Sequence, residues 1–470
     1  MLLFLRAYPH NAAVMRLAEA QLHSFPAKIA ELRERDTDVS WLEHPDVSGI
    51  AGSSVTDTFS FYLVRRLVQQ HPAQLSIYWD WFEDENRLAD AWPRFMPLLE
   101  EDALVEANVP YQKWLAAARG RKSEISWLIE RFDKLPLPDA QKAELYNAQN
   151  IYVRWTPPFA STRTGMRADT KTIFYHDGPF IQRRDINLKD ELHAPPPELR
   201  RLSAKDGERA LDLAREASTI RYRELYGFTH GDPARVYEAD LGRGVRLFLT
   251  GLPAGKRLPL RTYHAAMFFK NGVPIGYFEA LALFERMESG LNLYYTFRDG
   301  ETAWLYARTL NLMHHVVGVT SFAIDPYQIG FQNEEGIKSG AFWFYRKLGF
   351  RPTKREALQL VEKEEQKIAT RTNYRTSART LRKLAESSLI FELDQKRAGD
   401  WDDFQVRNIG FRMQGRAFDS LVSLVPNWST NEKQTLEPIV KAKSAAEEIT
   451  YLKLMREHAR LRTEIIKLGS

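Results

Sequence analysis

The spacing of apolar residues changes along the chain and divides it into regions. Residues 1–150 show mostly helical spacing, most clearly in AAVMRLAEAQLHSFPAKIAELRERD (12–36) and RLADAWPRFMPLLEEDALVEA (87–107). We therefore expect a helical N-terminal domain over 1–150, with one short strand in QLSIYWDWF. Residues 151–195 look more extended, and the segments NIYVRW, KTIFYHDG and FIQRRDI are candidate strands of a strand-rich connector.

A proline-rich segment, HAPPPEL (His193–Leu199), separates this connector from the rest. Three consecutive prolines exclude a helix and favour a stiff linker, so we place a domain boundary there. The clearest hairpin of the chain follows in YHAAMFFKNGVPIGYFEALALF, where Asn271-Gly272 suits a tight turn with positive φ. Pro274 indicates that nearby backbone lacks a ladder partner.

Strands and helices then alternate. LNLYYTF and TSFAIDP are typical of strands, and GETAWLYARTLNLMHHVVGV and NEEGIKSGAFWFYRKL are typical of helices, the second closed by Gly349. A helical stretch near 354–388, a strand in SLIFEL and a final charged helix or helix pair complete the chain. The pattern predicts an α/β (α+β) domain over 196–395 with a helical insertion at about 354–388, and a helical extension over 396–470.

Composition narrows the class of protein. The 470 residues include 66 Lys plus Arg and 61 Asp plus Glu, a net charge of +5, which is too mild to indicate a nucleic-acid partner by itself. The absence of cysteine excludes disulfides, thiolate metal sites and cysteine nucleophiles. The chain contains no stretch of 18 apolar residues, so we expect no membrane span. The first residues lack the layout of a signal peptide. We therefore expect a cytoplasmic protein.

The order of elements from Glu198 to Pro352 is the most specific signal. A strand, a helix, further strands with the hairpin, a second helix, a strand and a third helix succeed one another. The third helix ends in Ala341, Phe344, Tyr345, Leu348, Gly349 and Phe350. This resembles the GNAT-type N-acetyltransferases, whose fourth helix ends in a pattern close to A-x-x-F/L-Y-x-x-L/F-G-F. The resemblance covers about a third of the chain and implies a mixed sheet with two splayed central parallel strands, here Leu291–Phe297 and Thr320–Asp325.

The resemblance also implies a cofactor, acetyl-CoA or another acyl-CoA, in the cleft between those strands. Unpaired backbone groups would bind the pantetheine arm, and the helix N-terminus after the first strand would face the pyrophosphate. Against the family pattern R/Q-x-x-G-x-G/A, the glycine stands one place early and two acidic charges are added. The cofactor-binding candidates are Arg298, Asp299, Gly300, Glu301, Thr302, Ala303, Asn333 and Lys338.

Two residues are candidates for the chemistry of acyl transfer. The resemblance implies that Tyr345 is the acid that protonates the leaving thiolate. Glu279 lies in a largely apolar strand, where burial would raise its pKa toward the range of a general base. Asp325, at the end of the second splayed strand, is the other candidate base. His314 and His315 do not suggest a metal site, because adjacent helical residues point about 100° apart.

A basic ridge is expected if residues 354–388 are helical, because Lys367, Arg371, Arg375, Arg379 and Lys383 recur every four residues. Together with Arg382, these cations would bind RNA, an acidic partner or the phosphates of coenzyme A. Alternatively, they form a solvent-exposed surface without a partner. The leading expectation is an N-acyltransferase acting on a small-molecule or protein amine by direct attack. A degenerate GNAT fold that serves as a scaffold, and an aminoacyl-transferring or RNA-associated protein, remain as alternatives.

Overall fold

The computed structural model describes residues 1–82, 85–95, 109–413 and 428–470 and shows a mixed α/β protein made of two compact units. Unit 1 comprises Met1–Arg6, Asn11–Asp169 and Leu211–Thr229, and unit 2 comprises Ala7–His10, Thr170–Ala210 and His230–Ser470. The chain therefore passes between the units several times.

Unit 1 combines helices with a three-stranded antiparallel sheet of order β1-β3-β2. Its core includes the clustered rings of Phe61, Phe132 and Tyr146, whose centroids lie 5.4–6.0 Å apart. The elements that begin in this unit are α1 (Leu2–Ala7), α2 (Ala12–His23), α3 (Phe25–Glu34), β1 (Val55–Asp57), α4 (Phe61–Gln70), β2 (Leu75–Ile77), α6 (Tyr111–Ala118), α7 (Glu124–Lys134), α8 (Asp139–Ala148), β3 (Val153–Trp155) and α11 (Tyr226–Thr229).

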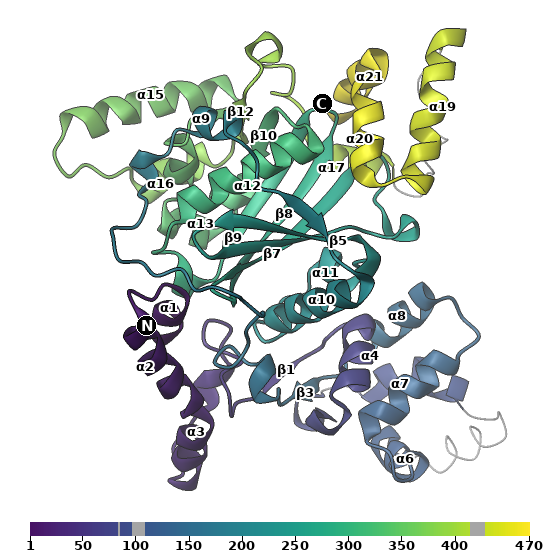
Figure 1. Ribbon diagram of the computed structural model, residues 1–470. Coiled ribbons are helices and arrows are strands. Elements are labelled where there is room, and N and C mark those ends of the chain that lie inside the picture. Colours follow the sequence, from purple (N-terminus) through teal and green to yellow (C-terminus); the bar gives the residue numbers. More distant parts are fainter. Residues whose placement is uncertain (83–84, 96–108, 414–427) are drawn as a thin grey trace. The chain divides into compact units, whose positions relative to one another are not determined.

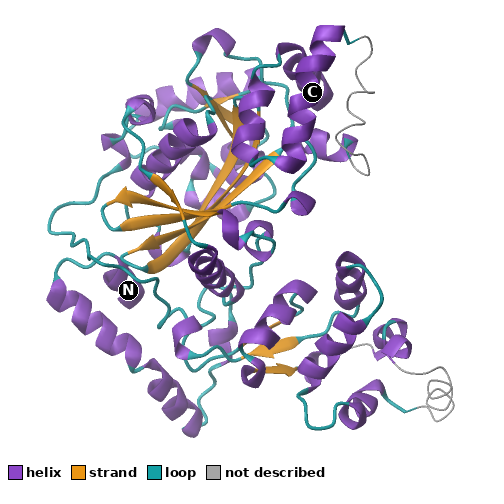
Figure 2. Ribbon diagram, turned by 45° about the vertical axis from the view of Figure 1, so that its right-hand side comes forward, coloured by secondary structure: helices purple, strands orange, loops and turns teal. Residues whose placement is uncertain are grey.

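Unit 2 is built on a nine-stranded sheet of order β11-β12-β10-β9-β8-β7-β6-β5-β4 (Figures 1 and 2). Its neighbours pair antiparallel except β9 and β10, which are parallel. The strands are β4 (Leu199–Arg201), β5 (Val236–Gly242), β6 (Val245–Thr250), β7 (Thr262–Lys270), β8 (Val273–Leu283), β9 (Arg286–Leu293), β10 (Ser321–Ile324), β11 (Arg351–Pro352) and β12 (Leu389–Glu392).

Helices complete unit 2, and the long helix α12 crosses the strands of the sheet (Figure 1). Beside α12 lies α9, and the Asn311 side-chain amide of α12 donates to the carbonyls of Glu191 and Ala194, each at 2.8 Å. The helices are α9 (Leu188–His193), α10 (Ala204–Thr219, which continues into unit 1), α12 (Thr302–Val317), α13 (Glu334–Ser339), α14 (Ala341–Arg346), α15 (Arg355–Thr370), α16 (Ala378–Leu384), α17 (Val406–Arg412), α19 (Thr430–Ala445), α20 (Glu448–Arg456) and α21 (Ala459–Gly469).

The expected hairpin is confirmed as β7 and β8. Asn271 and Gly272 have φ of 49° and 80°, the left-handed conformation that a two-residue turn requires. The register shifts beside Pro274, which confirms the interruption that this proline predicts.

Several expected elements differ from the structure. The strand expected over 291–297 is instead β9, which begins at Arg286 and ends at Leu293, and Tyr295–Phe297 form a 3₁₀ turn. KTIFYHDG and FIQRRDI contain no strand, and the helix expected over 87–107 is replaced by short 3₁₀ turns up to Phe95, with 96–108 outside the described residues. Where the sequence predicts one C-terminal helix or a helix pair, the structure has three helices, α19, α20 and α21.

Within the described ranges, every helix is too short or too polar to cross a bilayer.

Candidate functional site

An opening in the sheet lies between β9 and β10. Only Arg286, Met287 and Glu288 of β9 pair with β10, opposite Ser321–Ala323, and β9 continues to Leu293. The N–H of Ser321 donates to the Glu285 carbonyl at 3.0 Å, so by the two-residue repeat of a strand the odd-numbered residues of β9 turn their backbone groups toward β10. The backbone of Leu291 therefore faces the opening.

The end of β10 explains why the two strands part. Ile324 is followed by Asp325 and Pro326, and proline has no N–H to continue the ladder. Asp325 caps the next turn, because its carboxylate accepts the Tyr327 N–H at 2.8 Å, and it accepts two hydrogen bonds from Arg407 Nη2 at 2.7 Å. Asp325 is thus held by a turn and an ion pair.

Glu279 lies at the opening on one face of the sheet. It is directly opposite Gly290 of β9, and a Cβ at Gly290 would lie 3.0 Å from the side-chain nitrogen of Gln328. The Tyr263 hydroxyl donates to the Glu279 carboxylate. Burial raises the pKa of Glu279, and this hydrogen bond opposes the rise only in part. A carboxylate with a raised pKa beside a strand opening suits a general base.

Tyr345 lies on the other face. The ring of Tyr306 in α12 contacts the ring of Tyr345 in α14, with centroids 5.6 Å apart, and the Tyr306 hydroxyl bonds Ser289 Oγ at 3.0 Å. Ser289 precedes Gly290, so its side chain points to the face opposite Glu279. Burial raises the pKa of the Tyr345 hydroxyl far above its usual value, so it remains protonated.

The two predicted catalytic residues are therefore separated by the sheet and are not in contact. Glu279 of β8 lies opposite Gly290 on one face of the sheet. On the other face, Tyr345 contacts Tyr306, whose hydroxyl bonds Ser289 of β9. A ligand that passes between β9 and β10 would have access to both faces.

The helix that carries Tyr345 is not the single helix expected over 333–348. Gly340, with φ of 67°, divides it into α13 and α14. Helix α14 places Phe342 and Tyr345 in the core and ends at Arg346, and Gly349, three residues later, has φ of 100°. The close approach of the Phe391 ring to Gly349, 3.2 Å from where a Cβ would stand, leaves little space for a side chain.

The segment predicted to face the pyrophosphate, residues 298–303 (the phosphate loop), follows β9. Its side chains point to different surroundings. Arg298 donates to the Leu293 carbonyl at 3.2 Å and forms an ion pair with Glu335 of α13, while Asp299 is exposed. Gly300 packs against Tyr8, whose hydroxyl lies 2.6 Å from where a Cβ would stand. Thr302 Oγ1 donates to the Arg298 carbonyl at 3.0 Å, and Ala303 is buried in the first turn of α12.

Glu301 is part of a buried charge cluster and does not face the open side of the loop. Arg243 donates to its two carboxylate oxygens at 2.8 and 2.6 Å, and the Ile181 N–H donates at 3.0 Å. Burial works to raise the pKa of Glu301, but these hydrogen bonds outweigh it and hold the pKa below its usual value. The acidic charge that the sequence places at a pyrophosphate site is therefore neutralised by Arg243.

Lys270 lies in the same cluster without exposure to solvent. Its Nζ donates to the Arg243 carbonyl and stands 4.8 and 4.9 Å from the ring centroids of Tyr8 and Phe174. Burial lowers the pKa of Lys270 to about 7, with the nearby Glu301 opposing and Arg243 adding to the shift. Between pH 7 and 10 the unfolded chain consequently holds a proton at this position that the folded protein has lost.

Lys270→Met is expected to flatten the rise of stability with pH. Because the folded-state pKa is lowered, Lys270 makes the free energy of unfolding increase from about pH 7 to pH 10, by up to about 1.4 kcal/mol per pH unit. Urea unfolding at pH 7 and pH 9 measures this slope, with the exposed Lys205→Met as control. Equal slopes in wild type and Lys270→Met would contradict a lowered pKa.

The remaining cofactor candidates, Asn333 and Lys338, lie in α13. Asn333 caps this helix, because its carboxamide oxygen accepts the Gly336 N–H at 3.3 Å and its nitrogen donates to the Tyr327 carbonyl at 2.9 Å. Lys338 is exposed near the end of α13. Asn333 therefore has a structural role, and Lys338 is available to solvent.

The basic ridge is not a continuous helical stripe, which corrects the expectation of one helix over 354–388. Helix α15 ends at Thr370, so Lys367 belongs to α15, Arg371 and Arg375 lie in the connection, and Arg379 and Lys383 belong to α16. Lys367 pairs with Glu364 at 2.6 Å, and Arg382 pairs with Glu334 at 2.9 Å. Arg371, Arg375, Arg379 and Lys383 are exposed, and so is Arg382 despite its ion pair.

Four residues at the opening were missed by sequence reasoning. They are Ser289, Gly290, Tyr306 and Gln328. An isolated glycine within a strand pattern, such as Gly290, is a signal of close approach, but the strand expected from the sequence begins at Leu291, directly after it. Within the described ranges no group of three or more metal-ligating side chains is found, and His314 Nδ1 bonds the Val319 carbonyl at 2.7 Å.

Comparison of the chain with protein-family models, with curated proteins and with solved structures gave no match.

Proposed function

We propose that unit 2 is an N-acyltransferase of the GNAT type, which moves an acetyl or other acyl group from acyl-coenzyme A to an amine. One observation carries the proposal: β9 and β10 are parallel, separate after three residue pairs, and are each followed by a helical segment near the opening. This arrangement agrees with the splayed strands that the resemblance of residues 198–352 implies.

The residues at the opening suit transfer by direct attack. The pantetheine amides would bond the backbone groups of Leu291, which lie beyond the described pairing of β9 with β10, as a peptide strand does. The amine nitrogen attacks the thioester carbonyl and gives its proton to Glu279, directly or through a water molecule. The C–S bond then breaks, and the thiolate takes the proton of the Tyr345 hydroxyl, which leaves an amide and coenzyme A.

A second candidate is a non-catalytic binding module, and the state of the phosphate loop favours it. Arg298, the residue expected to meet the pyrophosphate, is engaged by Glu335 and the Leu293 carbonyl. The two functions differ in whether acyl-CoA displaces Glu335 from Arg298.

Calorimetric titration with acetyl-CoA is expected to detect binding to the wild type. Arg298→Glu should weaken it about 10-fold or more, because a charge-assisted contact to phosphate is replaced by repulsion. Arg200→Glu, an exposed change on β4, is the control and should bind like the wild type. If no heat of binding is detected at high micromolar protein, the enzyme proposal is refuted and the non-catalytic binding module remains as the proposed function.

A further inference from the structure

The face of the sheet that carries Glu279 is partly exposed at its centre. In β8 the side chains of this face, Tyr277, Glu279 and Leu281, are partly exposed, whereas the residues between them on the other face are buried. Directly beside Glu279 on the neighbouring strands stand Ala265 of β7 and Gly290 of β9. The closest residues across the sheet are therefore small, and solvent reaches Glu279 over this face.

Glu279 has no cation beside it. Among the described residues its carboxylate accepts the neutral Tyr263 hydroxyl and forms no ion pair. The next acid on the same face, Glu288, differs in this respect, because Arg286 Nη2 lies 2.9 Å from its carboxylate. Burial of a carboxylate without an opposite charge costs free energy, and a cationic ligand would supply the missing charge.

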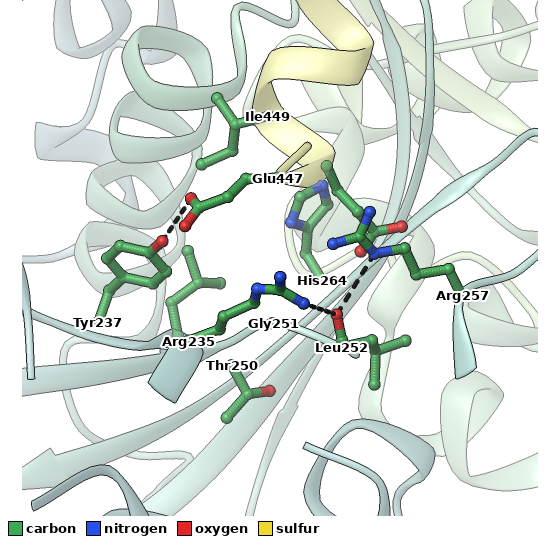
Figure 3. A pocket seen from close by; sticks show the side chains of 11 residues that line it. Arg235, Tyr237, Thr250, Gly251, Leu252, Arg257, His264, Glu447 and Ile449 are labelled. Atoms are coloured by element: carbon green, nitrogen blue, oxygen red, sulfur yellow. Dashed lines mark hydrogen bonds between the residues drawn. The ribbon is translucent and has the colours of Figure 1, made fainter. Parts of the chain in front are cut away.

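The cavity around Arg235, between β5, β6 and the start of α20, offers no such charge (Figure 3). Arg235 Nη1 lies 3.4 Å from an Asp232 oxygen. Glu447 accepts the Tyr237 hydroxyl at 2.5 Å and lies 3.4 Å from Arg201. Its volume of about 30 Å³ is enough for water but not for a larger molecule.

An aromatic pair lies next to Glu279 on the same face. The ring centroids of Tyr277 and Tyr294 are 6.4 Å apart, and the two rings are inclined at 56°. The Tyr294 hydroxyl bonds Met267 Sδ at 3.7 Å, which helps to hold its ring in this position. Both tyrosines are partly exposed, so a third ring can pack against them edge to face or offset.

The spacing between the acid and the aromatic pair indicates the length of a ligand that contacts both. Glu279 and Tyr277 are two residues apart in β8, which is about 6.6 Å along a strand. An amine nitrogen that is held by Glu279 and joined to a ring by two carbons brings that ring to Tyr277.

We propose that this face binds a primary amine that carries an aromatic ring, and that such an amine is the acceptor of unit 2. The nitrogen lies against Glu279, and the ring packs on Tyr277 and Tyr294. The role of the amine as acceptor rests on the proposed function, whereas its binding does not.

Calorimetry on the full chain without acyl-CoA tests the binding. The probe is 2-phenylethylamine, and ethylamine and 2-phenylethanol are the ligands that lack its ring or its charge. We expect 2-phenylethylamine to bind at least about 10-fold more tightly than either, because each of them loses one of the two contacts. Equal binding of 2-phenylethylamine and ethylamine would overturn the aromatic contact, and no binding of 2-phenylethylamine at low millimolar concentration would overturn the site.

Variants locate the bound amine. Tyr277→Ala and Glu279→Gln should each weaken 2-phenylethylamine about 10-fold, whereas Tyr277→Phe, which keeps the ring, should bind it like the wild type. Circular dichroism checks that each variant is folded, and Tyr277→Leu replaces Tyr277→Ala if that protein fails to fold. Unchanged binding in both Tyr277→Ala and Glu279→Gln would place the amine elsewhere and refute the proposal.

Release of the coenzyme A thiol from acetyl-CoA separates this inference from the proposed function. The wild type is expected to show a kcat/KM about 10-fold higher for 2-phenylethylamine than for ethylamine, and Tyr277→Ala should lose this difference. Equal kcat/KM for the two amines in the wild type would refute the aromatic acceptor and leave the acyltransferase. Binding of 2-phenylethylamine without thiol release from any amine would instead refute acyl transfer and leave the amine site.

Discussion

Replacing Tyr345 by phenylalanine is expected to lower the rate of acyl transfer about 100-fold or more while leaving the protein folded. The hydroxyl is the proton donor in the proposed reaction, and burial raises its pKa so that it stays protonated across the working range of pH. No hydrogen bond to this hydroxyl is found among the described residues, so its removal should cost little stability.

The measurement is release of the coenzyme A thiol from acetyl-CoA in the presence of simple primary amines. Tyr175→Phe, at an exposed tyrosine, is the control for activity. Tyr306→Phe is the control for structure, because it removes the bond to Ser289 and should lower the free energy of unfolding by about 1 kcal/mol. If Tyr345→Phe turns over like the wild type, Tyr345 belongs to the core alone.

Glu285→Ala is expected to lower the free energy of unfolding of unit 2 by about 1–3 kcal/mol, because it removes the buried acceptor shared by Trp401 and Arg462, while Arg462 keeps its ion pair with Asp400 at 2.9 Å. Glu285 occupies the turn between β8 and β9 and is buried. Its carboxylate accepts Trp401 Nε1 at 2.9 Å and Arg462 Nε at 2.8 Å, and Arg397 lies 3.7 Å away. The C-terminal helix α21 is thereby tied to the start of β9.

Urea unfolding measures this loss. Glu285→Gln keeps an acceptor for Trp401 but not the charge, so it should fall between Ala and wild type. Glu362→Ala, on the exposed side of α15, should stay within about 0.5 kcal/mol of wild type. A Glu285→Ala protein as stable as the control would show that the ion pairs contribute nothing net.

The parts of the fold that could be predicted are those fixed by local chemistry. Asn271-Gly272 indicated the β7–β8 turn because only a few residues accept positive φ at both positions. Gly349 indicated that the helix stops nearby for the same reason, although α14 ends at Arg346, three residues before it. The long apolar stripe of α12 was equally readable.

The parts that could not be predicted depend on distant segments. The expected strand begins at Leu291, whereas β9 begins at Arg286. The Arg286 guanidinium lies 5.0 Å from the ring of Phe404, a residue far along the chain. Glu301 looked like a hindrance to a phosphate, but its partner Arg243 comes from the β5–β6 turn. The cavity around Arg235 required α20, which no local pattern connects to β5.

The order in which the strands are made has a consequence for synthesis of this protein. β10 has two neighbours in the sheet, β9 by three residue pairs and β12 by four, and β12 is translated only after α13 to α16. A growing chain therefore carries β10 with one edge uncovered until residue 392 emerges. The sheet of unit 2 therefore cannot be completed before residue 392 has emerged, and chains interrupted between β10 and β12 are expected to be the ones that aggregate.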